Sequence, residues 1–104
     1  MSSRLGKLEA MLSAAPGDQL LRYMLAMELD RADLSDRSLA EFVHLMQQTP
    51  PYVPAFLMAG QLLMRLGQVE RARSVFVDGI AAAQEAGNSH AAGEMAGFLA
   101  SLGN

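Results

Sequence analysis

The stretch FLMAGQLLMRLGQVERARSVF, residues 56–76, reads as two helices joined at a glycine. Apolar residues recur at intervals of three and four on both sides of Gly67, which is the spacing of amphipathic helices. Gly67 itself suits a left-handed helix end. Gly60, however, lies within the apolar side of the first helix, where glycine costs about 1 kcal/mol relative to alanine. A glycine in that position needs a packing reason, such as the close approach of another element.

The whole chain is organised as helices separated by short breaks. Strand-forming β-branched residues are sparse, whereas Ala, Leu, Met, Gln and Glu are abundant. Turn-forming residues lie at Pro16-Gly17, 31–36, 49–52, Gly67 and Gly87-Asn88. The segments between these breaks predict six helices, at about residues 3–14, 18–32, 36–48, 52–66, 69–86 and 90–102.

Several helix ends carry residues with known capping chemistry. The expected N-caps of the second, third and sixth helices are Asp18, Ser35 and Ser89, whose side-chain oxygens can accept from free backbone N–H groups. Gly67 and Gly87 are expected to end the fourth and fifth helices in the left-handed conformation. Asp33 holds the corresponding place after the second helix, and aspartate tolerates that conformation better than most residues do.

A shift of the sequence by 34 residues brings similar residues into register. The matched pairs are Leu25 with Ala59, Ala26 with Gly60, Leu29 with Leu63, Ser38 with Ala72, and Phe42 with Phe76. A period of this length in paired helices is typical of the tetratricopeptide repeat, whose pattern is W-x2-L-G-x2-Y, then A-x3-F, then P.

The chain resembles the tetratricopeptide repeat family over residues 17–84, and residues 5–16 resemble a half repeat. The residues that fit the pattern best are Phe56, Ala59, Gly60, Leu63, Ala72 and Phe76. Arg22 replaces the aromatic residue of the first repeat, and Gln84 replaces the closing proline of the second, which lets the fifth helix run longer. The segment GIAAAQEAGNSHAAGEMAGFLASL, residues 79–102, also resembles the ending of small bacterial members of the family.

The resemblance implies an all-α fold, an α-α superhelix of about two full repeats with an N-terminal half repeat and a C-terminal capping helix. We expect one domain over residues 1–104, with repeats at about 19–52 and 53–86 and the capping helix at about 89–102. Leu5, Leu8, Met11 and Leu12 would cover one end of the stack, and Met95, Phe98, Leu99 and Leu102 the other.

This fold gives Gly60 a role, because the first helix of a repeat crosses its partner helix most closely at that position. Ala26 and Gly60 are expected to face the small residues Ser38 and Ala72. The rings of Phe42 and Phe76 would then fill the space between adjacent repeats, and close packing would offset the cost of the glycine.

Members of this family generally bind another protein or a peptide on the concave surface lined by the first helix of each repeat. By repeat register, the expected partner-binding residues are Tyr23, Met24, Met27, Arg31, Leu57, Met58, Gln61, Met64 and Arg65, and the same two stripes also contain Leu20, Asp30 and Pro54. Methionine suits surfaces that accommodate several partners, and the two arginines could hold a carboxylate. The competing interpretation is that some of the methionines belong to the core.

An apolar or amphipathic peptide is the partner that such a face fits. The Lys and Asn side chains that hold chaperone EEVD tails in some family members are missing, because Tyr23, Met27 and Met58 stand in their places. The alternative is a homo-oligomeric structural subunit, or a weak homodimer, formed through the same face. The sequence leaves open whether the last helix caps the stack or occupies the groove.

Other function classes have little support in the sequence. The net charge is −3 without a basic run, which argues against nucleic acid, and no apolar stretch reaches membrane-spanning length, so a cytoplasmic location is expected. His90 and Glu94 have the spacing of two metal ligands but lack a third, and 30–36 lacks the spacing of a calcium loop. Nucleophile and phosphate-loop motifs are absent, so we expect neither an enzyme nor a cofactor.

Overall fold

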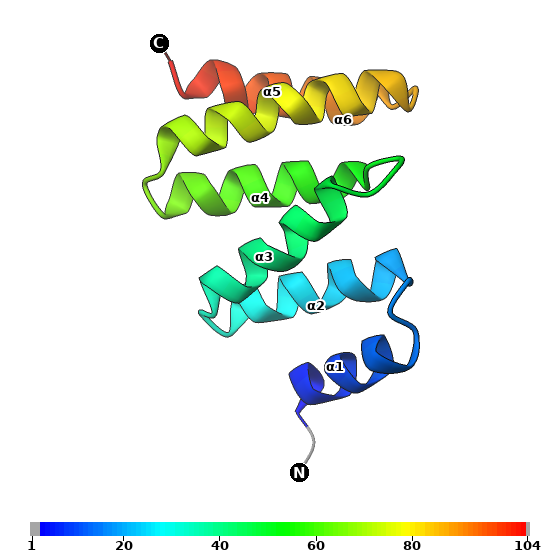
Figure 1. Ribbon diagram of the computed structural model, residues 1–104. Coiled ribbons are helices and arrows are strands. Elements are labelled where there is room, and N and C mark those ends of the chain that lie inside the picture. Colours follow the sequence, from blue (N-terminus) through cyan, green and yellow to red (C-terminus); the bar gives the residue numbers. More distant parts are fainter. Residues whose placement is uncertain (1–2, 104) are drawn as a thin grey trace.

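The computed structural model describes residues 3–103, and every regular element in that range is an α-helix (Figure 1). The helices are α1 (Arg4–Ala14), α2 (Gln19–Arg31), α3 (Ser35–Met46), α4 (Val53–Arg65), α5 (Val69–Glu85) and α6 (Ser89–Ser101). The predicted all-α class is confirmed, and each helix begins and ends within one or two residues of its predicted limits.

The six helices run back and forth in one stack, each packed on the next (Figure 1). The described chain is elongated, with extents of 46 × 29 × 18 Å. Helix α1 lies at one end and α6 at the other, where α6 packs on α5 and also touches α4. The last helix therefore caps the stack, which answers the question that the sequence left open.

Gly60 is buried in α4 against the ring of Phe76 on α5. A Cβ atom at position 60 would fall among the Cε1, Cζ and Cδ1 atoms of this ring, with Cδ1 only 2.8 Å away. Close packing explains the glycine, as predicted, but the atoms that require it belong to Phe76 and not to Ala72. The aromatic ring lies nearer to the α4 backbone than the repeat pattern alone suggested.

In the first repeat, a hydrogen bond joins the two helices at the corresponding crossing. Ser38 on α3 is fully buried, and its Oγ donates to the backbone oxygen of Ala26 on α2 at 2.6 Å. Small side chains therefore face each other here as predicted. The hydroxyl adds a polar contact that needs the two helices to lie close together.

The two phenylalanines of the repeat pattern join successive layers of the stack. Phe42 on α3 packs in a cluster with residues of α2 and α4, which connects the two repeats. Phe76 on α5 packs with residues of α4 and α6, and its ring stacks on that of Phe98 with centroids 5.6 Å apart. Both rings are fully buried, so the predicted filling of the space between repeats is confirmed.

The ends of the stack are covered largely as expected. Leu8 and Leu12 of α1 are buried in a cluster with Leu25 and Leu29 of α2. Met95 of α6 is fully buried, and its predicted companions Phe98, Leu99 and Leu102 pack against the same cluster. The prediction was wrong for Met11, which is 51% exposed and does not pack into the cluster that Leu8 and Leu12 form with α2.

Most of the predicted helix ends are present. The Asp18 carboxylate accepts a hydrogen bond from the backbone N–H of Leu21 at 3.0 Å. Gly67, Gly87 and Asp33 all have positive φ angles, of 75°, 72° and 60°. Each reverses the chain direction after a helix, as the sequence predicted.

Two predicted N-caps were wrong by one residue. Ser35 and Ser89 are the first residues of α3 and α6, and not the residues before them. Asn88 caps α6 instead, since its side-chain oxygen accepts from the backbone N–H of Ala91 at 3.0 Å. Leu34 precedes α3 and provides no side-chain cap. In each of these two turns a residue with positive φ, Asp33 or Gly87, reverses the chain direction, and the next helix starts one residue earlier than predicted.

Arg22 compensates for the missing aromatic residue of the first repeat. Its Nη1 atom lies 2.7 Å from Glu41 Oε1 on α3, and its Nη2 atom donates to the backbone oxygen of Pro16 at 3.0 Å. The guanidinium group therefore ties α2 both to α3 and to the turn that follows α1. A planar group with several donors can bridge these elements, as a lone aromatic ring cannot.

Candidate functional site

The residues predicted to bind a partner form one stripe on α2 and an equivalent stripe on α4. The α2 stripe consists of Leu20, Tyr23, Met24, Met27, Asp30 and Arg31, and the α4 stripe of Pro54, Leu57, Met58, Gln61, Met64 and Arg65. Leu20, at the start of its stripe, is 57% exposed. Pro54 and both arginines are also exposed, and the remaining members are half-buried. We call the two stripes together the α2–α4 face.

Contacts at both ends connect the two stripes. Near the start of the helices, the Tyr23 ring lies 5.4 Å from the ring of Tyr52, which immediately precedes α4. At the other end, Arg65 Nη2 lies 2.6 Å from Asp30 Oδ2. Between them, Met27 and Met58 pack against the same buried cluster. The α2–α4 face is therefore one continuous surface.

Tyr23 contributes an aromatic surface that is anchored from behind. Its ring packs edge-on against Phe42, with centroids 6.0 Å apart and planes at 61°. Burial raises the pKa of the Tyr23 hydroxyl above its ordinary value, and the neighbouring Tyr52 raises it further. The side chain therefore stays neutral at physiological pH and offers a partner an aromatic edge with an uncharged hydroxyl.

The methionines of the face contact the core on one side and remain partly exposed on the other. Met24 packs against the cluster that joins α1 to α2, Met27 and Met58 against the Phe42 cluster, and Met64 against the Phe76 cluster. The two interpretations that the sequence allowed, core and surface, thus each describe one side of these side chains. An adaptable thioether held at its base can follow the shape of a partner.

The polar groups of the face are already engaged within the protein. Arg65 pairs with Asp30, and Arg31 lies 3.7 Å from Glu28, which also pairs with Arg4 at 3.1 Å. Gln61 Nε2 donates to the backbone oxygen of Leu57 at 3.2 Å. A carboxylate from a partner would have to compete with these acidic groups for the arginines. What the face offers without competition is apolar contact.

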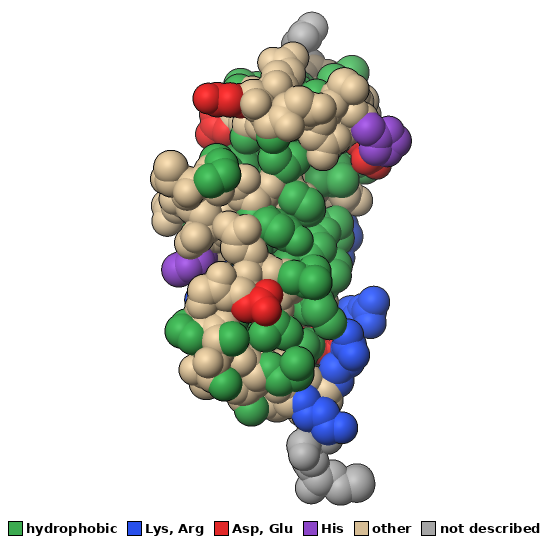
Figure 2. All heavy atoms as spheres, turned by 90° about the vertical axis from the view of Figure 1, so that its right-hand side faces the viewer, with side chains coloured by type: hydrophobic (Ala, Val, Ile, Leu, Met, Phe, Trp, Pro, Cys, Tyr) green, Lys and Arg blue, Asp and Glu red, His purple; other side chains and the backbone are tan. Residues whose placement is uncertain are grey.

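Figure 2 views the molecule from the side where the α1–α2, α3–α4 and α5–α6 turns lie. Hydrophobic side chains form a continuous band along this view, from the α1 end of the stack towards the α6 end. Lysine and arginine side chains gather beside the band near the α1 end. Several layers of the stack thus contribute exposed apolar atoms to one surface.

The residues considered as metal ligands do not form a metal site in the described part of the chain. His90 Nε2 lies 3.2 Å from Glu94 Oε1, so the two side chains contact each other at the surface. Within residues 3–103, no three His, Asp or Glu side chains come together as a ligand set. None of the helices in the same range is both long and apolar enough to cross a lipid bilayer.

A cavity of about 580 Å³, which was not predicted from the sequence, lies outside the α2–α4 face. It opens between the α3–α4 turn and the second half of α5. Its signal in the sequence was the absence of a closing proline at Gln84, because a longer α5 supplies one wall.

The chain is similar in structure and sequence to several solved structures, whereas no family model and no curated protein matches it. The solution structure of a tetratricopeptide repeat domain protein from Salinibacter ruber is 31% identical, with a TM-score of 0.79 over 85% of this chain and 89% of that chain. A crystal structure from the same organism, also of a tetratricopeptide repeat domain protein, is 30% identical, with a TM-score of 0.75 over 82% and 96%. A protein from Bordetella parapertussis is 29% identical, with a TM-score of 0.80 over 98% and 89%.

Proposed function

Because this chain belongs to the tetratricopeptide repeat family, we propose that it is a non-enzymatic protein-interaction module that binds an apolar or amphipathic peptide on the α2–α4 face. A general role in protein interaction follows from the family. The choice of face and of peptide chemistry is our proposal. One observation carries this proposal: the apolar side chains of the face are half-buried, and the polar side chains beside them are already paired within the protein.

The chemistry of the α2–α4 face favours a partner that contributes apolar side chains. Met27 and Met58 offer apolar atoms near the middle of the face and Tyr23 offers them near one end, and all three pack against the Phe42 cluster. The exposed arginines and their acidic partners lie at one end, where they would form a polar rim. An amphipathic segment would place its apolar side on the methionines and its polar side towards solvent.

The size of the face limits the affinity. Helices α2 and α4 have 13 residues each, which corresponds to about 20 Å along the axis. A peptide in contact with only two helices of this length buries a small area, so we expect a dissociation constant in the micromolar range. Tighter binding would need several copies of the domain or of the peptide.

A second copy of the chain is the competing occupant of the face. Half-buried methionines and the exposed Leu20 would gain from burial against any apolar surface, including their own counterpart. The measured mass decides between the two occupants. A mass that rises with protein concentration, and falls when Leu20 is replaced by glutamate, supports self-association. A mass that stays monomeric supports a foreign peptide.

Leu20→Glu tests the proposal without disturbing the core, because Leu20 is 57% exposed on the α2–α4 face. We expect this variant to keep wild-type stability within about 0.5 kcal/mol and to lose partner binding by about tenfold or more, since a carboxylate would replace an apolar contact. The measurement is capture of proteins from the host lysate, followed by titration of the purified partner.

Val77→Glu is the matched control. Val77 lies on α5 and is 52% exposed, so the same substitution adds the same charge outside the α2–α4 face. The partner should bind this variant as it binds the wild type. Equal binding by the wild type and Leu20→Glu, or a loss confined to Val77→Glu, would contradict the proposed face.

A further inference from the structure

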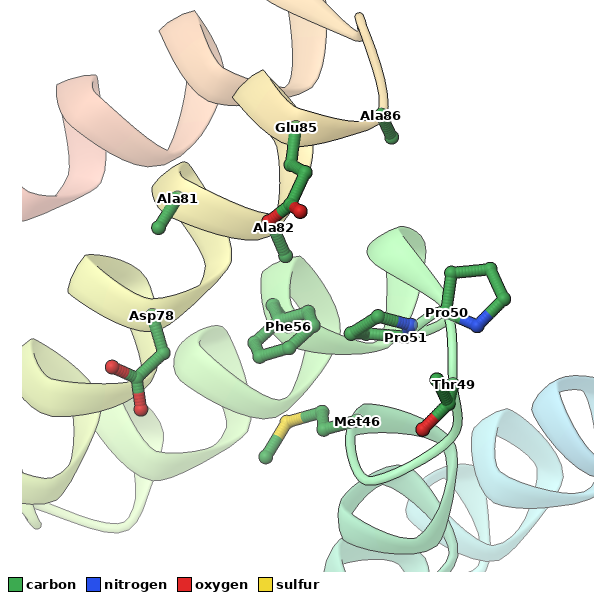
Figure 3. Close-up of a pocket in the computed structure, with 10 residues that line it drawn as sticks. All are labelled: Met46, Thr49, Pro50, Pro51, Phe56, Asp78, Ala81, Ala82, Glu85 and Ala86. Carbon is green, nitrogen blue, oxygen red and sulfur yellow. The ribbon is translucent and has the colours of Figure 1, made fainter.

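The cavity between the α3–α4 turn and α5 has an apolar floor and an acidic rim (Figure 3). Met46 and Phe56 form the floor, Pro50 and Pro51 form one wall, and Ala82 lies opposite them on α5. None of its lining residues belongs to the α2–α4 face. The volume of about 580 Å³ is large enough for several side chains of a bound segment.

One wall of the cavity exists because the second repeat departs from the first. Helix α3 has 12 residues and ends at Met46, whose counterpart in the second repeat is Ile80. Helix α5 has 17 residues and continues to Glu85. The lining residues that α5 contributes beyond Ile80 are Ala81, Ala82 and Glu85, followed by Ala86 at its end. A proline at position 84 would have disfavoured this extra length.

Two carboxylates on α5 border the apolar hollow. Asp78 and Glu85 are seven residues apart on one stripe of the helix, about 10 Å along its axis, with Ala81 and Ala82 between them. Neither carboxylate makes an ion pair with any residue of the described range 3–103. No Lys, Arg or His lines the cavity. The site therefore combines exposed negative charge with an unfilled apolar surface.

We propose that this cavity is a second docking site, independent of the α2–α4 face, for an extended segment that carries two cationic residues three positions apart with apolar residues between them. In a polyproline II helix, residues i and i+3 lie on the same side at a separation of about 9 Å. This separation matches that of Asp78 and Glu85. One intervening apolar side chain then points away from α5, towards Met46, Phe56 and the prolines.

The alanines of α5 make this arrangement possible. Their small side chains leave room for the aliphatic stems of lysine or arginine to lie along the helix while the charged ends reach Asp78 and Glu85. Ion pairs at an exposed rim contribute orientation and salt sensitivity more than affinity, and the apolar contacts must supply the rest. Binding should therefore weaken when salt is added, without disappearing.

The test uses a fluorescein-labelled peptide, GSRLPRSG, with an acidic counterpart, GSELPESG. We expect the first peptide to bind at high-micromolar concentration and to shift the backbone amide signals of residues 46–49, of Tyr52 and of residues 78–86. The acidic peptide should not bind. The double variant Asp78→Asn/Glu85→Gln should weaken binding by about tenfold.

Two control variants make the result specific. Asp36→Asn/Glu70→Gln removes the same two charges from residues outside the cavity and should change the affinity by less than about twofold. Leu20→Glu alters the α2–α4 face and should leave binding of the peptide unchanged, so that failure of one proposal is distinguishable from failure of the other. Three outcomes would overturn the second docking site: binding of the peptide that does not saturate at about 1 mM, shifts of amide signals that belong to α2 and α4 instead, or an equal loss of affinity in the two double variants.

Discussion

Gly60→Ala is expected to lower the free energy of unfolding by about 2 kcal/mol, although alanine is the better helix former. The added methyl group would meet the ring of Phe76, and this ring is fully buried between α4, α5 and α6. Phe76 cannot move aside without disturbing its stacking on Phe98. The overpacking penalty should therefore exceed the gain of about 1 kcal/mol in helix propensity. Urea unfolding followed by far-UV circular dichroism measures the change.

Gly93→Ala is the matched control for this prediction. Gly93 also lies within a helix, but a Cβ atom there would meet nothing within 4 Å. Only the propensity gain remains, so this variant should be more stable than the wild type by up to about 1 kcal/mol. If Gly60→Ala stabilised the protein to the same extent, the account of Gly60 as a close-packing residue would be wrong.

Met24→Glu/Met58→Glu is expected to abolish partner binding while the helical fold persists. Each substitution places a carboxylate within the apolar part of the α2–α4 face, where a bound peptide would have to remove its water without providing a compensating charge. Both methionines are half-buried and contact core clusters, so we expect a stability cost of about 1–2 kcal/mol for each. Titration with the captured partner, after the fold is checked by circular dichroism, measures the loss of binding.

Met24→Leu/Met58→Leu provides the comparison that separates binding from packing. Leucine has a similar volume, so this variant should lose less than about 1.5 kcal/mol for each substitution and should still bind. A folded glutamate variant with wild-type affinity would rule out the central part of the face. An unfolded glutamate variant beside a folded leucine variant would assign the two methionines mainly to the core.

The sequence was sufficient to predict the stack of helices because the signals that specify it are local or periodic. Apolar spacing located the helices, and the 34-residue register identified Gly60 and Phe76 as positions in one repeat. The pattern did not show which atoms press on Gly60, since this depends on how far the Phe76 ring reaches from α5 towards the α4 backbone. It also placed the caps at Ser35 and Ser89 one residue late, because turn geometry decides where a helix begins.

The candidate site was predictable by register but not in its electrostatics. Repeat register assigned both Asp30 and Arg65 to the α2–α4 face, but it did not predict that these two side chains, 35 residues apart in the sequence, pair with each other. Such a pairing depends on the twist between successive layers and on side-chain rotamers, which a periodic pattern does not specify. The cavity beside α5 was missed for a related reason, since it forms where a longer helix faces a turn from the preceding repeat.

Photo-crosslinking from position 20 tests the proposed face most directly. A benzoylphenylalanine that replaces Leu20 keeps the position apolar and exposed, and the same group in place of Val77 provides the control on α5. We predict that the partner is crosslinked from position 20 and not from position 77. Crosslinking from position 77 alone would contradict the α2–α4 face as the binding surface.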